Sequence, residues 1–413
     1  RLLKLERAIE ALETTVSRQE RRLAALEGRV IEPRAVIEDT VEPADATESV
    51  TGSFSDGWAL SAVKGTPALV GRSLLILAGA FLLRALTETG TLGASAGVGL
   101  GLAYATSWIV AAAMAAHRGA RASAGFFAVC AALIADPLIF EASTEFGVLT
   151  PVGGALILAI VTAAGLFVAS RWQRPESAWV FVIGAMVTGG ALAVVRPPGE
   201  AATTVLVALG LAGVWLAGRH GWESLRWVTA VGADIGVLRL TAMATAPGGP
   251  HDMSPPIPTL VGGLQGLLAL GYVGSSVARA LRGRRPVRVF DFVQSGAAWA
   301  IGWGGAVQLA RAHDIGTGGL ASFALFVGLA AYAAAFGVVD RVHGRNRAFF
   351  FLSTLGLVLV LLGIPGVLGP LSSGVWAMLA VIGAAAGSRW DRVTLRAHAV
   401  VLLIAAWVTS GVG

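Results

Sequence analysis

Residues 148–174 read VLTPVGGALILAIVTAAGLFVASRWQR, in which 23 uncharged residues precede Arg171 and Arg174. A helix needs about 20 apolar residues to cross the hydrocarbon core of a bilayer. The run shows no alternation of apolar and polar residues, and an open strand would leave its backbone groups unsatisfied in lipid. This stretch therefore predicts a transmembrane helix whose basic end lies at one membrane surface.

The same pattern recurs along most of the chain, which is 55% hydrophobic and 14% charged over its 413 residues. Soluble domains average about 45–50% apolar and about 25% charged residues. The sequence therefore predicts an all-α, polytopic transmembrane protein whose membrane domain comprises residues 67–413. About thirteen apolar stretches are long enough, or nearly so, to cross a bilayer, and they lie near 67–86, 92–116, 122–140, 148–170, 177–195, 200–218, 225–244, 257–280, 287–309, 315–339, 346–368, 371–388 and 396–413.

Arginines mark alternate ends of these stretches. The loops after the even-numbered stretches hold 17 arginines, whereas the odd-numbered loops and adjoining helix ends hold 4. The positive-inside rule assigns the 17 arginines to the cytoplasm, so the N-terminus is expected there. An odd number of spans then leaves Gly413 external. Since the basic residues lie in short loops between apolar runs, the sequence predicts no nucleic-acid partner.

A short motif recurs within the membrane domain. The segment SRWQR at 170–174 returns as SRWDR at 388–392, and looser versions begin at Arg219, Arg282 and Arg341. Each version is expected to open a hairpin of two helices. The motif therefore predicts repeated helical hairpins.

A heptad repeat of apolar residues occupies residues 2–30. Branched residues at a with leucine at d favour a parallel, two-stranded coiled coil, and a parallel pair brings Arg22 near Glu27 of the second strand. We expect a cytoplasmic coiled-coil helix over residues 1–30, pairing through 2–30 with a second copy or a partner protein. The alternative is an amphipathic helix packed on its own chain. The predicted seam comprises Leu5, Ile9, Leu12, Val16, Gln19, Leu23 and Leu26.

The segment that follows, residues 31–66, differs from both of its neighbours. It is rich in Glu, Asp, Thr, Ser and Pro and has little periodicity. Such segments bury too little apolar surface to fold alone. We expect an acidic, flexible linker between the coiled coil and the membrane domain.

The first membrane stretch carries a family resemblance. Residues 71–86 read GRSLLILAGAFLLRAL and are followed by Glu88 and Gly90, and 149–151 read LTP. Together with the preceding coiled coil and acidic linker, these segments resemble the bacterial predicted membrane proteins known as domain of unknown function 2339. The resemblance implies a multi-pass protein of the bacterial cytoplasmic (inner) membrane and no established activity.

Polar residues inside the apolar stretches are candidate site residues. Asp234 lies near the middle of the seventh stretch and needs a partner from another helix, or protonation, because charge inside the bilayer is costly. On the ninth stretch, Asp291, Gln294 and Gln308 share a sector of about 120° at 100° per residue. This stripe predicts either hydrogen bonding between helices or a polar pathway for an ion, a proton or a lipid headgroup. Arg84 is expected to pair with Glu88 one helical turn away.

The sequence contains no recognisable catalytic constellation. Residues 93–97 read GASAG, which matches a nucleophile motif but opens an apolar stretch, where close helix packing explains the glycines better. Cys130 is the single cysteine, which excludes an intramolecular disulfide. We therefore expect no cofactor, no metal and no enzymatic activity. A non-enzymatic scaffold or subunit of a membrane assembly is the leading hypothesis, and a transporter or lipid/glycan carrier using stretches 7 and 9 is the alternative.

Overall fold

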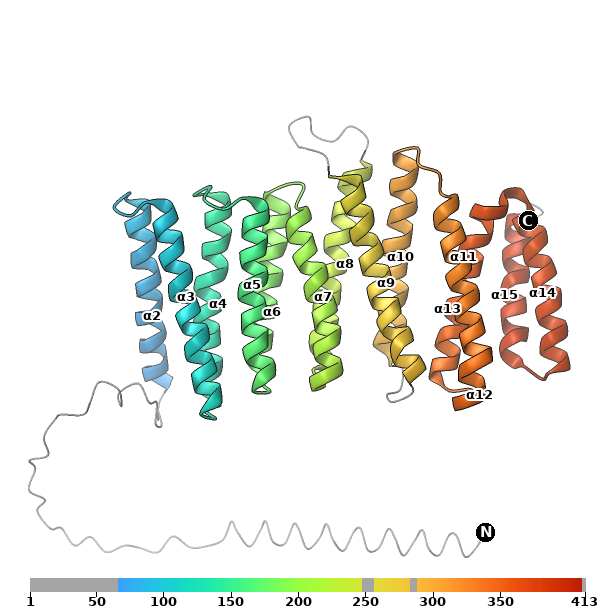
Figure 1. Ribbon diagram of the computed structural model, residues 1–413, viewed down its shortest axis with the longest axis horizontal. Helices are drawn as coiled ribbons and strands as arrows, with labels where there is room; N and C mark the ends of the chain where they lie inside the picture. Colours follow the sequence, from blue (N-terminus) through green and yellow to red (C-terminus); the bar gives the residue numbers. More distant parts are fainter. Residues whose placement is uncertain (1–65, 247–255, 283–287, 411–413) are drawn as a thin grey trace, which may run out of the picture. The chain divides into compact units, whose positions relative to one another are not determined.

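The computed structural model describes residues 66–246, 256–282 and 288–410. Every element in these ranges is a helix, and the helices follow one another in chain order (Figure 1). All of them belong to the compact unit Ala62–Gly413. The expected coiled coil over residues 1–30, with its seam, lies outside the described residues, as does the expected linker apart from Thr66.

The helical elements are α2 (Thr66–Glu88), α3 (Ala94–His117), α4 (Arg121–Thr144), α5 (Pro151–Arg171), α6 (Pro175–Val195), α7 (Glu200–His220), α8 (Glu223–Thr245), α9 (Pro258–Arg282), α10 (Val289–Ala312), α11 (Gly318–Ala333), the π-helical turn η2 (Ala334–Val339), α12 (Asp340–His343), α13 (Arg347–Leu368), the 3₁₀ turn η3 (Gly369–Leu371), α14 (Ser372–Arg389) and α15 (Val393–Thr409). Each of the thirteen apolar stretches coincides with one helix, except that the tenth is divided between α11 and η2. The predicted all-α class is confirmed for the described residues.

Fewer helices meet the length and hydropathy of a membrane span than the thirteen apolar stretches of the sequence. Among the described residues, nine helical segments are long and apolar enough to cross a membrane, and one of these, Arg347–Arg389, contains both α13 and α14. The helices α2, α10 and α15 are not among the nine. In α10 the polar residues Asp291, Gln294 and Gln308 lower the hydropathy, and α15 is only 17 residues long.

Large apolar side chains lie on the outer faces of these helices. Phe167 on α5 is 67% exposed and Phe326 on α11 is 71% exposed. A soluble monomer rarely exposes extended apolar surface, whereas a bilayer solvates such surface favourably. The exposed faces are therefore those expected of helices surrounded by lipid.

Successive helices form antiparallel pairs. The most extensive contacts join α3 with α4, α7 with α8, α9 with α10, α11 with α13, and α14 with α15. In each of these pairs the connection is one of the arginine-rich segments. The sequence analysis expected each segment to stand before the first helix of a hairpin. Instead, each segment is the turn between the two helices, and most of these turns are only two or three residues long.

The repeated SRWxR motif forms the same turn twice. In the first copy Gln173 has a left-handed backbone (φ 54°) and the Arg174 N–H donates to the Ala169 carbonyl at 2.8 Å. In the second copy Asp391 (φ 47°) and the Arg392 N–H, which donates to the Gly387 carbonyl at 2.8 Å, reproduce it. This six-residue closure terminates a helix and reverses the chain. The repeat is thus a repeated helix-ending turn.

The arginine-rich turns lie at one end of the helices. In Figure 1 the turns after α3, α5, α7, α12 and α14 lie at the lower end, and the connections after α2, α4, α6, α10 and α13 lie at the upper end. This follows from the antiparallel order of the helices. The alternation of charge along the sequence is therefore an alternation in space.

The Asp136–Pro137 step does not end a helix. Pro137 lies inside α4, which continues through it to Thr144. Proline removes one backbone hydrogen bond from a helix, and neighbouring helices in a membrane domain tolerate this loss. Here α4 packs against α3 and α6, which hold it in place.

Candidate functional site

Asp234 finds its partner on another helix. The side chain of Gln294 on α10 donates from Nε2 to both carboxylate oxygens of Asp234 on α8, at 3.0 Å each. Both residues are buried, at 8% and 3% exposure. The sequence analysis required either such a partner or protonation for Asp234, and the structure supplies the partner.

Asp291 is the centre of a second group at the arginine-rich end. Its Oδ1 lies 2.5 Å from Nη2 of Arg279 on α9 and 3.9 Å from Nη1 of Arg226 on α8. Its Oδ2 accepts the backbone N–H of Arg288 at 2.9 Å, which caps the first turn of α10. One carboxylate thus joins the ends of three helices. Such charge-assisted bonds are stronger than neutral ones.

Arg226 is buried despite its charge. Its exposure is 6%, its guanidinium lies 4.3 Å from the ring centroid of Phe290, and it also pairs with Glu223 one turn earlier on α8. The sequence analysis counted Arg226 and Arg279 only as loop arginines that set the topology. Their roles as partners of Asp291 were missed. The signal in the sequence was the three-residue spacing of Glu223 and Arg226, which places two opposite charges side by side on a helix and indicates a pairing role for Arg226.

Two further contacts continue the polar line along α8, α9 and α10. Ser276 and Ser295 approach to 3.1 Å between their hydroxyl oxygens. Farther from the arginine-rich end, Gln265 donates to the Thr241 hydroxyl at 2.7 Å. We call the polar residues that these contacts join the polar seam, and they are Arg226, Asp234, Thr241, Gln265, Ser276, Arg279, Asp291, Gln294 and Ser295.

Gln308 does not join the polar seam. Its side chain is exposed, whereas Gly302 and Gly305 of the same helix are buried. Gln308 lies at the edge of the 120° sector, about 60° from Gly305 at 100° per residue. That offset turns it away from α9. Three of the four intramembrane candidates therefore belong to the polar seam of α8, α9 and α10, and they are Asp234, Asp291 and Gln294.

The chemistry available to the polar seam is hydrogen bonding and charge pairing. Among the described residues no group of three His, Cys, Asp or Glu side chains could hold a metal ion. The buried side-chain atoms of these helices that have no hydrogen-bond partner within the described ranges include the Tyr272 hydroxyl and the Gln265 Oε1. Every carboxylate of the seam, in contrast, is paired.

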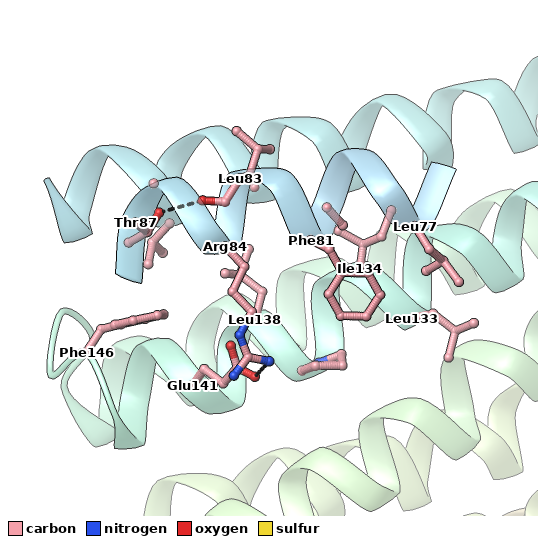
Figure 2. A pocket seen from close by; sticks show the side chains of 15 residues that line it. Leu77, Phe81, Leu83, Arg84, Thr87, Leu133, Ile134, Leu138, Glu141 and Phe146 are labelled. Carbon is pink, nitrogen blue, oxygen red and sulfur yellow. Dashed lines mark hydrogen bonds and ion pairs between the residues drawn. The ribbon is translucent and has the colours of Figure 1, made fainter. Parts of the chain in front are cut away.

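A second polar group lies beside a cavity of about 290 Å³ between α2, α3 and α4 (Figure 2). Arg84 is 2.7 Å from Glu88, as the helical spacing predicts, and 2.6 Å from Glu141 on α4. Figure 2 shows Arg84 and Glu141 between Phe146 on one side and Phe81 and Leu133 on the other side of the same lining. The expected pair is confirmed, and it also joins α2 to α4.

These observations define an all-α protein of the membrane type. Comparison with known proteins finds no family model, no curated protein and no solved structure that matches the chain. The resemblance to the family of domain of unknown function 2339 stays an expectation from the sequence.

Proposed function

We propose that this protein is a non-enzymatic scaffold or subunit of a membrane assembly. The observation that carries the proposal is that the carboxylates of the polar seam bond to side chains of neighbouring helices. Asp291 bonds to Arg279, and Asp234 bonds to Gln294. Paired groups of this kind hold helices together and leave no free charge to move a substrate. The expected coiled coil over residues 2–30 supplies the contact with a second copy or a partner protein.

The proposed location is the bacterial cytoplasmic membrane, with the lipid bilayer around about thirteen spans. The 17 arginines of the even-numbered loops support a cytoplasmic N-terminus and an external Gly413. A cytoplasmic coiled coil can then reach soluble or membrane-bound partners, and residues 31–66 set its reach. Membrane attachment of both strands raises their effective concentration.

A transporter or a lipid/glycan carrier is the alternative. The observation that favours it is the pair of unpartnered buried atoms, the Tyr272 hydroxyl and the Gln265 Oε1, on the helix that also carries seam residues. A buried polar group without a hydrogen-bond partner lowers the stability of the fold, so a role in binding is one explanation for its presence. In this alternative, Asp234 changes partners during transport.

Removing residues 1–30 from the full chain separates the two functions. Purification from native membranes in mild detergent is expected to lose most co-purifying protein in this deletion, because the coiled coil is the docking element. The double variant Asp234→Leu with Gln294→Leu is expected to keep its partners. Replacing both members of a buried pair by apolar groups is nearly neutral for stability.

Thermal unfolding of both proteins in the same detergent serves as the control for folding. The reverse result, with partners kept by the deletion and lost by a folded double variant, contradicts the scaffold proposal. A folded double variant that keeps its partners but abolishes uptake of a solute by reconstituted vesicles would favour the transporter.

A further inference from the structure

A cavity of about 650 Å³ lies between two helical pairs near the C-terminal end of the described chain. One wall comes from α11, η2, α12 and α13, and the other from α14 and α15. Small-molecule pockets in proteins have volumes of about 300–1,000 Å³. Most of the lining is apolar and includes Leu357, Val360, Leu379, Ile382, Leu395 and Leu402.

The lining is charged at the arginine-rich end. Arg392 lies 2.5 Å from Asp340, so this pair is neutral as a whole. Arg341 also lines the cavity, is exposed, and has no ion-pair partner among the described residues. Trp390, which is 65% exposed, completes this end. The charged lining therefore has a net charge of +1 and an aromatic ring typical of a membrane interface.

A polar pair lies deeper in the cavity. The Tyr332 hydroxyl is 2.7 Å from Nδ1 of His398, which is 8% exposed. His398 follows Arg392 by six residues, which is about 9 Å along a helix. When Tyr332 donates to Nδ1, the neutral ring carries its proton on Nε2. In that tautomer the Nε2–H has no hydrogen-bond partner within the described ranges and can donate to a ligand.

The backbone between Tyr332 and Asp340 is irregular. The π-helical turn Ala334–Val339 interrupts the tenth stretch, and Phe336 within it lines the cavity and stacks on Tyr332 at 5.9 Å between ring centroids. π-Helical turns are found frequently at functional sites. Here the turn sets the position of Asp340 and Arg341 relative to Tyr332.

We propose that this cavity binds one anionic phospholipid of the surrounding bilayer. The phosphate pairs with Arg341, an ester carbonyl below it accepts the Nε2–H of His398, and an acyl chain lies along the leucine-rich lining. Charge lies at the membrane surface, the His398 donor lies about 9 Å from Arg392 along α15, and apolar residues lie beyond it. This is the order of the headgroup, the ester and the acyl chain in a phospholipid. The net positive charge selects an anionic headgroup over a zwitterionic one.

Native mass spectrometry of the purified full chain in detergent tests this proposal. Wild-type protein is titrated with phosphatidylglycerol or with phosphatidylcholine of the same acyl chains. We expect one tightly bound phosphatidylglycerol and about tenfold weaker binding of it by Arg341→Gln, which is the effect of losing one charged hydrogen bond. The matched control is Arg345→Gln, an exposed arginine of the same turn that does not line the cavity, with unchanged binding.

A second pair of variants tests the apolar part of the cavity. Ala386 lines the cavity and Ala384 on the same helix is exposed outside it. Ala386→Phe is expected to displace the lipid and Ala384→Phe to retain it. Inorganic phosphate, which lacks acyl chains, is expected not to compete.

Equal binding by Arg341→Gln and Arg345→Gln would overturn the proposal, as would equal retention of the two phospholipids by the wild type. Displacement of the lipid by inorganic phosphate would identify a simple anion site instead. If Ala386→Phe does not fold, the comparison of the two arginine variants decides alone.

Discussion

Replacing Asp291 with leucine is expected to lower the free energy of unfolding of the membrane domain by about 3–5 kcal/mol. The substitution removes the ion-pair partner of Arg279 and leaves Arg226 with Glu223 as its remaining partner. Arg226 is 6% exposed, so water cannot replace the lost carboxylate there. The substitution also removes the acceptor of the Arg288 N–H in the first turn of α10.

Titration of the purified protein with sodium dodecyl sulfate in mixed micelles measures this loss. Asp291→Asn keeps an acceptor oxygen without the charge, so an intermediate loss is expected. Gln308→Leu is the matched control on the same helix, and its exposed position predicts a change of no more than about 0.5 kcal/mol. Equal unfolding midpoints for Asp291→Leu and Gln308→Leu would show that the pairing around Asp291 contributes nothing.

The second large effect is expected at Gly302, where α9 and α10 cross. A Cβ atom at this position would lie 2.5 Å from the Gln265 carbonyl oxygen and 2.9 Å from the Ala269 Cβ. Backbone atoms cannot rotate away, so Gly302→Ala must push the helices apart. We expect a loss of about 1–3 kcal/mol, which is typical of overpacking.

Gly304→Ala is the control for this prediction. Gly304 lies on the same helix, two residues away, and a Cβ there meets nothing within 4 Å. Alanine favours a helix over glycine by about 1 kcal/mol, so this variant is expected to be unchanged or slightly stabilised. A Gly302→Ala protein as stable as Gly304→Ala would contradict the close crossing of α9 and α10.

Much of the helical architecture could be predicted because apolar length and basic ends are local properties of the sequence. The need of Asp234 for a partner was equally local, since it depends only on its position within an apolar stretch. That the partner is Gln294, 60 residues away, depends on how α8 and α10 pack. No single-helix pattern carries that information.

Sequence reasoning failed where a residue has two roles. Arg226 and Arg279 fit the charge alternation of loops, and that fit concealed their burial against Asp291. Gln308 fitted the helical stripe, but the angles of residues around one helix do not show which of those residues a neighbouring helix covers. Tyr332 and His398 are 66 residues apart and give no local signal.

We expect the arginine-rich turns to lie on the cytoplasmic side of a membrane and the other connections on the outside. Single cysteines at His313 and at Arg345, which are both exposed in connections of opposite kinds, test it most directly. Cys130 is 3% exposed and is replaced by alanine in both proteins. With a membrane-impermeant maleimide on intact cells, we expect His313→Cys to be labelled, and Arg345→Cys to be labelled only after permeabilisation. Labelling of both cysteines, or of Arg345→Cys alone, in intact cells would contradict the account.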